Sequence, residues 1–193
     1  MTATLATIPS ASQTTISRTP SVVSGLDAFG LTNQAQSLAR SGDLVGAERL
    51  HLQALDVKTK GFGYQTPQVA TTLHSLAEVQ IRLGKYAEAE QNLRSSVAIR
   101  SNSTIQHDQI EAAKSRELLA QILERSGNLA AAKNVRLAGQ QEWIACGNSK
   151  CVGQCFRIEQ LSHCGQCRSV LYCSSDCQGR DWRSRHRFYC HSP

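Results

Sequence analysis

The first 145 residues of this 193-residue chain contain no cysteine, whereas all eight cysteines lie between Cys146 and Cys190. Positive charge and aromatic side chains are also concentrated in this last part, which carries five of the ten aromatic residues. So abrupt a change in composition indicates two kinds of structure in one chain. We predict a division at residues 145/146, with a cysteine-rich domain at 146–193.

The chain also lacks any run of about 18 apolar residues, which excludes a transmembrane helix and makes a membrane partner unexpected. Residues 1–25 are rich in Ser and Thr, and they have neither the basic start nor the continuous apolar core of a secretory signal. We predict that they form a disordered polar tail and that the protein is intracellular, in the cytoplasm, the nucleus or both. Since those compartments keep thiols reduced, the clustered cysteines are expected to bind metal rather than to form disulfides.

Proline is nearly absent between residues 26 and 145, where Pro67 stands alone among many Ala, Leu, Gln, Glu and Arg residues. This composition predicts successive helices. One pattern of alanines and a glycine recurs twice, at offsets of 42 to 43 residues. Small residues let two helices approach closely, and glycine suits the turn between them. We therefore predict about three helical hairpins, with Ser101–Gln109 as a longer loop; the repeated positions are Ala35, Gly42 and Ala47, then Ala77, Gly84 and Ala89, then Ala120, Gly127 and Ala132.

The segment Thr66–Glu90 resembles a tetratricopeptide repeat of the kinesin-light-chain type. The resemblance implies an all-α repeat whose hairpins stack into a concave surface that binds a peptide or a partner helix. A generic antiparallel helical bundle would show similar spacings, and polar residues on such a face are also compatible with simple solvation. The candidates for the concave surface are Asn33, Gln36, His74, Arg82 and Lys114.

The cysteine-rich part contains four short pairs of sulfur and nitrogen ligands, which is the spacing typical of tetrahedral zinc sites. Four pairs predict two structural zinc ions. So short a segment has too few apolar residues for a core of its own, and metal binding supplies the missing stability. The ligand candidates are Cys146, Cys151, Cys155, Cys164, Cys167, Cys173, Cys177, His186 and Cys190.

The segment Ser162–Cys190 resembles the MYND-type zinc finger, with the family's Tyr172-Cys173, Cys177-Gln178 and Asp181-Trp182 dipeptides and a final His186-x3-Cys190. The resemblance implies that ligand pairs alternate: one zinc takes Cys164, Cys167, His186 and Cys190, and the other takes the first and third pairs. Spacing alone leaves a sequential arrangement open. The first pair is also open, since Cys146 with Cys151 matches a form found in the family, while Cys151 with Cys155 is the alternative.

The resemblance to the MYND family also implies a ligand: proline-containing peptides of the type Pro-x-Leu-x-Pro. It implies that Gln178 and Trp182 line the groove that binds them. A flat aromatic ring packs well against proline, and an amide fixes an extended backbone. An equally open alternative is that Trp182 forms the core of the small domain. The leading hypothesis is a non-catalytic adaptor, with the finger binding one protein or peptide and the repeats a second.

Two other functions are weighed against the adaptor. Four arginines near Trp182 suggest a transcriptional regulator that contacts DNA directly: Arg180, Arg183, Arg185 and Arg187. However, residues 146–193 carry seven basic and three acidic side chains, a formal +4 that falls to about +1 once seven thiolates and two Zn²⁺ are counted, which disfavours nucleic acid. A methyltransferase-related fragment is disfavoured because no SET sequence and no catalytic constellation are present, so we expect no enzyme. The oligomeric state is not predicted.

Overall fold

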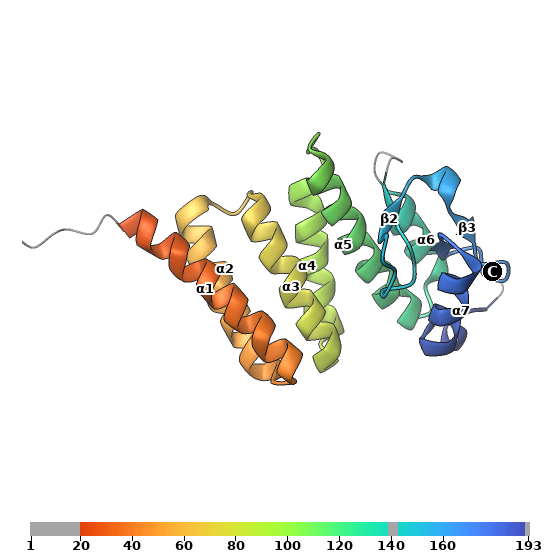
Figure 1. Ribbon diagram of the computed structural model, residues 1–193, viewed down its shortest axis with the longest axis horizontal. Helices are drawn as coiled ribbons and strands as arrows, with labels where there is room; N and C mark the ends of the chain where they lie inside the picture. Colours follow the sequence, from red (N-terminus) through yellow and green to blue (C-terminus); the bar gives the residue numbers. More distant parts are fainter. Residues whose placement is uncertain (1–19, 139–142, 192–193) are drawn as a thin grey trace, which may run out of the picture.

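A computed structural model describes residues 20–138 and 143–191, and its first part is a row of stacked helical hairpins (Figure 1). Helix α1 begins within the segment predicted to be a tail, whose residues 1–19 lie outside the described residues. None of the described helices is both long and apolar enough to cross a membrane. The hairpins pair α1 (Pro20–Ser41) with α2 (Leu44–Phe62), α3 (Pro67–Leu83) with α4 (Tyr86–Arg100), and α5 (Gln106–Arg125) with α6 (Leu129–Leu137).

The repeated glycines and alanines occupy the positions that the helical-hairpin prediction requires. Gly42, Gly84 and Gly127 connect the two helices of each hairpin with φ of 96°, 79° and 80°, a left-handed conformation that side chains disfavour. All six repeated alanines are completely buried, and their small side chains let the helices approach each other closely at these positions. The helical-repeat fold is therefore confirmed, including a third hairpin whose sequence pattern is looser.

The helix starts follow from local capping, and one predicted loop is shorter than expected. Thr66 caps α3 by accepting a hydrogen bond from the Val69 amide, with Pro67 in the first turn. The loop predicted at Ser101–Gln109 ends at residue 105, because α5 already begins at Gln106. The Asp108 carboxylate in its first turn accepts from the Ser103 hydroxyl at 2.8 Å, which favours this early helix start.

The cysteine-rich part contains little regular structure. Strand β1 (Ile144–Ala145) pairs antiparallel with β2 (Cys155–Phe156), and β3 (Ser162–His163) pairs antiparallel with β4 (Leu171–Tyr172). Helix α7 (Ser175–Ser184) follows, and short 3₁₀ turns occupy Ile158–Gln160 and His186–Phe188. Strand β1 is the first element of this part of the chain, and residues 139–142 before it lie outside the described residues. We call residues 144–191 the finger.

The finger packs directly on the third hairpin (Figure 1). Ala113 of α5 forms a small buried cluster with Ala145 and Cys155, flanked by Trp143. On the other side, Leu129 of α6 joins the buried cluster of the finger. Repeats and finger therefore share a continuous interface that buries apolar side chains from both.

Candidate metal centre

Eight side chains of the finger gather into two groups of four. Within each group, the candidate ligand atoms all lie within 4.8 Å of one another. Successive pairs of ligands along the chain belong alternately to one group and to the other, so the arrangement is interleaved rather than sequential. The first tetrad is Cys146, Cys151, Cys173 and Cys177, and the second tetrad is Cys164, Cys167, His186 and Cys190.

The distances within each tetrad match the dimensions of a tetrahedral zinc site. Zn–S bonds of about 2.3 Å place two sulfurs about 3.8 Å apart, and a sulfur and an imidazole nitrogen about 3.5 Å apart. The Sγ atom of Cys173 lies 3.6 Å from that of Cys151 and 3.6 Å from that of Cys177. In the second tetrad, the Cys164 and Cys190 Sγ atoms are 3.8 Å apart, and Cys167 Sγ is 3.4 Å from His186 Nε2. Both donor sets therefore have the spacing that Zn²⁺ needs.

Local backbone structure brings the ligands of the first tetrad together. Ser174 caps α7 by accepting from the Cys177 amide, which fixes the turn between Cys173 and Cys177. Asn148 Nδ2 donates to Cys177 Sγ at 3.4 Å, a contact that stabilises a thiolate. Between Cys146 and Asn148, a Cβ on Gly147 would lie 2.2 Å from Val170, so only glycine fits there.

The second tetrad is supported by a carboxylate from the repeats. Glu124 of α5 is almost completely buried, and its Oε2 lies 4.0 Å from His186 Nδ1, the ring nitrogen that faces away from Cys167. This distance is too long for a hydrogen bond, so Glu124 acts on the His186 ring through its charge and its packing. Glu124 pairs with Arg136 at 2.7 Å and with Arg185. Burial alone would raise the pKa of Glu124, but these two guanidinium groups lower it, so the group is ionised.

A chain of buried polar contacts continues from Glu124 into both parts of the protein. Arg185 also pairs with Asp181 at 2.8 Å, and Asp181 accepts from the Tyr172 hydroxyl at 2.8 Å. On the repeat side, Arg136 donates to Glu117 at 2.6 Å and to the Ser169 carbonyl of the finger at 3.2 Å. Sequence reasoning did not single out Glu117, Glu124 or Arg136, because nothing distinguishes them from charged side chains on a solvated helix face.

Cys155 lies apart from both tetrads. Its Sγ–H donates to the Ile110 carbonyl of α5 at 3.7 Å, within the interface between finger and repeats. Burial is the main reason that the pKa of its thiol is raised to about 11, so the group is neutral at physiological pH. Of the two candidates left open by the sequence, the structure brings Cys146 to the first tetrad and leaves Cys155 in the interface.

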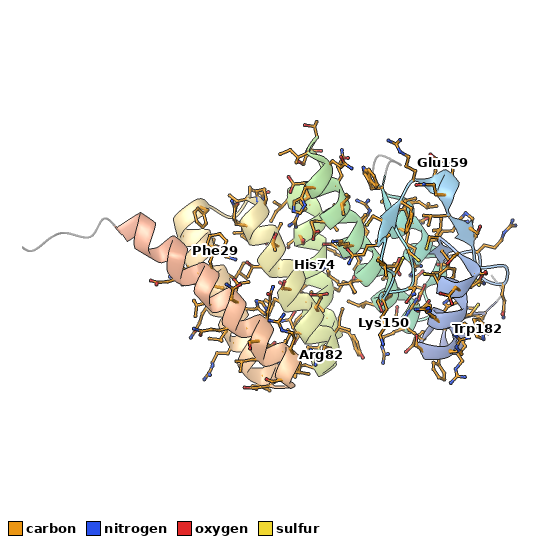
Figure 2. All side chains as sticks on the ribbon, viewed as in Figure 1. Phe29, His74, Arg82, Lys150, Glu159 and Trp182 are labelled. Carbon is orange, nitrogen blue, oxygen red and sulfur yellow. The ribbon has the colours of Figure 1, made fainter. Side chains whose placement is uncertain are left out.

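Gln178 and Trp182 lie one turn apart on α7 and share a face of this helix. The Trp182 ring meets the His186 ring edge to face, with centroids 5.9 Å apart. Trp182 nevertheless remains 37 % exposed, and it lies on the outer side of α7 in Figure 2. Its side chain therefore both packs against the second tetrad and presents part of its aromatic surface to solvent.

The other polar candidates are divided among several places. Gln36 and Arg82 line a hollow between α1 and α3, while His74 and Lys114 line a second hollow between the repeats and the finger. Asn33 is exposed and lines neither of these two. Among the four arginines, Arg185 is taken into the interface with Glu124, and Arg187 lies over the exposed Phe188 ring.

Comparison with known families agrees with this architecture. The tetratricopeptide repeat family matches residues 27–102, and the MYND finger family matches residues 145–190. The chain is thus a MYND-finger protein with N-terminal tetratricopeptide repeats, and the third hairpin lies beyond the matched repeat segment. A MYND finger with two such tetrads fits two structural zinc ions. No curated protein gives a significant match to the chain.

Proposed function

We infer that this protein is a non-catalytic adaptor that holds two protein partners, one on the finger and one on the repeats. Both matched families are protein-interaction domains, which supports the general role. The packing of the finger on α5 and α6 supports joint action of the two parts, because it fixes their relative position. The division into a tail, repeats and finger as functional units at residues 25/26 and 145/146 remains part of this proposal.

The two zinc ions have a structural role in this account. The first tetrad holds one ion between the Cys146–Cys151 turn and the start of α7, and the second holds the other between Cys164–Cys167 and the C-terminal turn. Zinc bound by four protein ligands has no open position for a substrate, which is typical of structural rather than catalytic sites. The chain's own contribution is to bind the ions and keep α7 in place.

The finger's ligand, in this proposal, is a proline-containing peptide of the type Pro-x-Leu-x-Pro that binds along the outer face of α7. The observation that carries this assignment is the exposed ring of Trp182, held edge-on against His186 with Gln178 one turn before it. The ring packs against proline, and the Gln178 amide has a donor and an acceptor for an extended backbone.

A binding measurement with the full chain tests this assignment. The probe is a fluorescein-labelled peptide containing Pro-Ala-Leu-Ala-Pro, followed by fluorescence anisotropy. We expect Trp182→Ala to weaken binding by about ten-fold or more, as removal of a central aromatic anchor does. Phe188→Ala is the matched control, because Phe188 is an exposed aromatic residue outside this face of α7. Equal affinity of wild type and Trp182→Ala, with two zinc ions retained in both, would refute the assignment.

A further inference from the structure

Two hollows meet at the turn formed by Asn148 and Ser149, which line both of them. The first has a volume of about 140 Å³ and separates the finger from α3 and α5, with Glu78, Lys114, Gln121 and Gln154 in its walls. The second has a volume of about 250 Å³ and lies between the same turn and α7, with Lys150, Arg180 and Arg183 in its walls. We call the two together the junction groove.

The walls of the junction groove are held in fixed positions. Lys150 lies on the turn between Cys146 and Cys151, and its amide donates to Asn148 Oδ1 at 3.1 Å. The opposite wall is α7, whose first turn carries Cys177. Because Cys146, Cys151 and Cys177 belong to the first tetrad, one metal site sets the separation of the two walls.

The finger end of the groove is strongly basic. Lys150, Arg180 and Arg183 are all exposed there, and no carboxylate lines this hollow. Arg180 pairs with the exposed Asp176 at 3.0 Å, whereas Lys150 and Arg183 form no ion pair with any residue that the structure describes. The acidic side chains of the groove, Glu78 and Glu117, lie at its repeat end, where Arg136 already neutralises Glu117.

The remaining lining favours a polypeptide over a nucleic acid. Two amide side chains, Gln121 on α5 and Gln154 on the finger, can form hydrogen bonds with the backbone of an extended peptide. No Phe, Tyr or Trp lines either hollow among the residues that the structure describes, so there is no platform on which bases would stack. A carboxylate-rich peptide satisfies both the cations and the amides.

We propose that the junction groove binds an extended Asp- and Glu-rich segment of a partner protein, with its carboxylates on Lys150, Arg180 and Arg183. This surface is distinct from the face of α7 assigned to proline-containing peptides. Residues two positions apart on a helix point to nearly opposite sides, so Arg180 faces away from Gln178 and Trp182. Figure 2 shows Lys150 and Trp182 on opposite sides of α7.

The experiment titrates the full, zinc-loaded chain with an octapeptide of alternating Glu and Gly, followed by two-dimensional NMR at about 50 mM salt. We expect amide chemical shifts to change at Lys150, Arg180, Arg183 and Gln154, and no comparable changes with a peptide in which Gln replaces Glu.

Variants of the groove test the same binding. The Lys150→Glu/Arg183→Glu variant should bind the acidic peptide at least about ten-fold more weakly. Arg157→Glu/Arg187→Glu is the matched control for charge, because it reverses two arginines that are exposed outside the groove, and it should bind as wild type. Trp182→Ala should also retain acidic-peptide binding, which separates this test from the one for proline-containing peptides.

Five results would overturn the proposal. Equal loss of binding in Arg157→Glu/Arg187→Glu would show attraction to net charge alone. Unchanged binding in Lys150→Glu/Arg183→Glu, or no binding by the wild type, would exclude the groove. Loss of a zinc ion from that variant by native mass spectrometry would mean that these cations merely offset the formal −2 charge of a zinc ion with four thiolates. Tighter binding of a single-stranded oligonucleotide of the same charge would assign the surface to nucleic acid.

Discussion

Arg136 is the side chain that joins the repeats to the finger at the scale of single residues. Its side chain is 1 % exposed and donates to both oxygens of Glu117, at 2.6 and 3.0 Å. It also pairs with Glu124 and reaches the Ser169 carbonyl in the finger. These carboxylates raise the pKa of Arg136 in spite of its burial, so the guanidinium stays charged. Because Arg136, Glu117 and Glu124 are buried together, removal of any one of them leaves a buried charge without its partner.

Replacing Arg136 therefore has a large predicted effect. Arg136→Ala leaves Glu117 and Glu124 buried without their common partner, and we expect a loss of about 3–5 kcal/mol in the free energy of unfolding. The measurement is urea denaturation at neutral pH with zinc present. Arg94→Ala is the matched control, because the exposed Arg94–Glu90 pair on α4 should contribute less than about 1 kcal/mol. Similar losses in both variants would contradict the assigned role of Arg136.

The ligand residues could be predicted from the sequence, whereas their support could not. Thiols and an imidazole in closely spaced pairs have few other roles where thiols are kept reduced, so their chemistry is evident from spacing. Glu124 and Arg185 are 61 positions apart, and they meet only because the finger folds back on α5. No local pattern encodes that contact. The ambiguity between Cys146 and Cys155 has the same origin, since Ile110 of α5 accepts from the Cys155 thiol.

At the scale of elements, the hairpin turn is the feature that the sequence predicts best. A glycine with positive φ and two buried alanines recur in each hairpin because close helix packing and a left-handed turn both restrict the residue type. The sequence predicts a loop that extends to Gln109, whereas α5 begins at Gln106. The difference arises because the contact between Ser103 and Asp108 depends on side-chain geometry rather than on composition. The repeat pattern predicts Ala132 within α6, but it predicts neither the short length of α6 nor its contact with the finger.

Two glycines with opposite requirements test the role of the turn. At Gly84, with φ of 79°, Gly84→Ala forces a side chain into the left-handed region and should destabilise the protein by about 1 kcal/mol. At Gly30, inside α1, a Cβ would meet no atom within 4 Å, so Gly30→Ala should stabilise it by about 0.5–1 kcal/mol. Thermal unfolding of both variants measures these changes. If both substitutions changed the stability in the same direction, the turn conformation would not explain why glycine recurs at this position of each hairpin.

At the scale of the whole molecule, the finger completes the row of helices. In a repeat protein each unit is stabilised mainly by its neighbours, and the last unit needs a cover. Here the finger covers α5 and α6, and two buried contacts cross that interface: the ion pair of Arg185 with Glu124 and the hydrogen bond from Arg136 to the Ser169 carbonyl. Stability of the third hairpin is therefore expected to depend on the metal-bound finger.

Metal removal tests this dependence. After chelation of zinc, we expect amide hydrogen exchange to accelerate by about ten-fold or more in α5 and α6, because the finger no longer packs on them. Exchange in α1 and α2 should change little, because this hairpin packs mainly on α3 and lies away from the finger. Mass spectrometry of peptic fragments resolves the two regions. Unchanged protection in α5 and α6 after loss of both zinc ions would contradict the dependence of the third hairpin on the finger.

The number of zinc ions bound by cysteine variants tests the central claim most directly, namely that two interleaved tetrads hold the finger together. Native mass spectrometry of the full chain should find two zinc ions in the wild type. Cys155→Ser should also retain two, because Cys155 lies in the interface with α5, whereas Cys146→Ser should lose the ion of the first tetrad. Two tightly bound ions in Cys146→Ser together with one in Cys155→Ser would contradict the account.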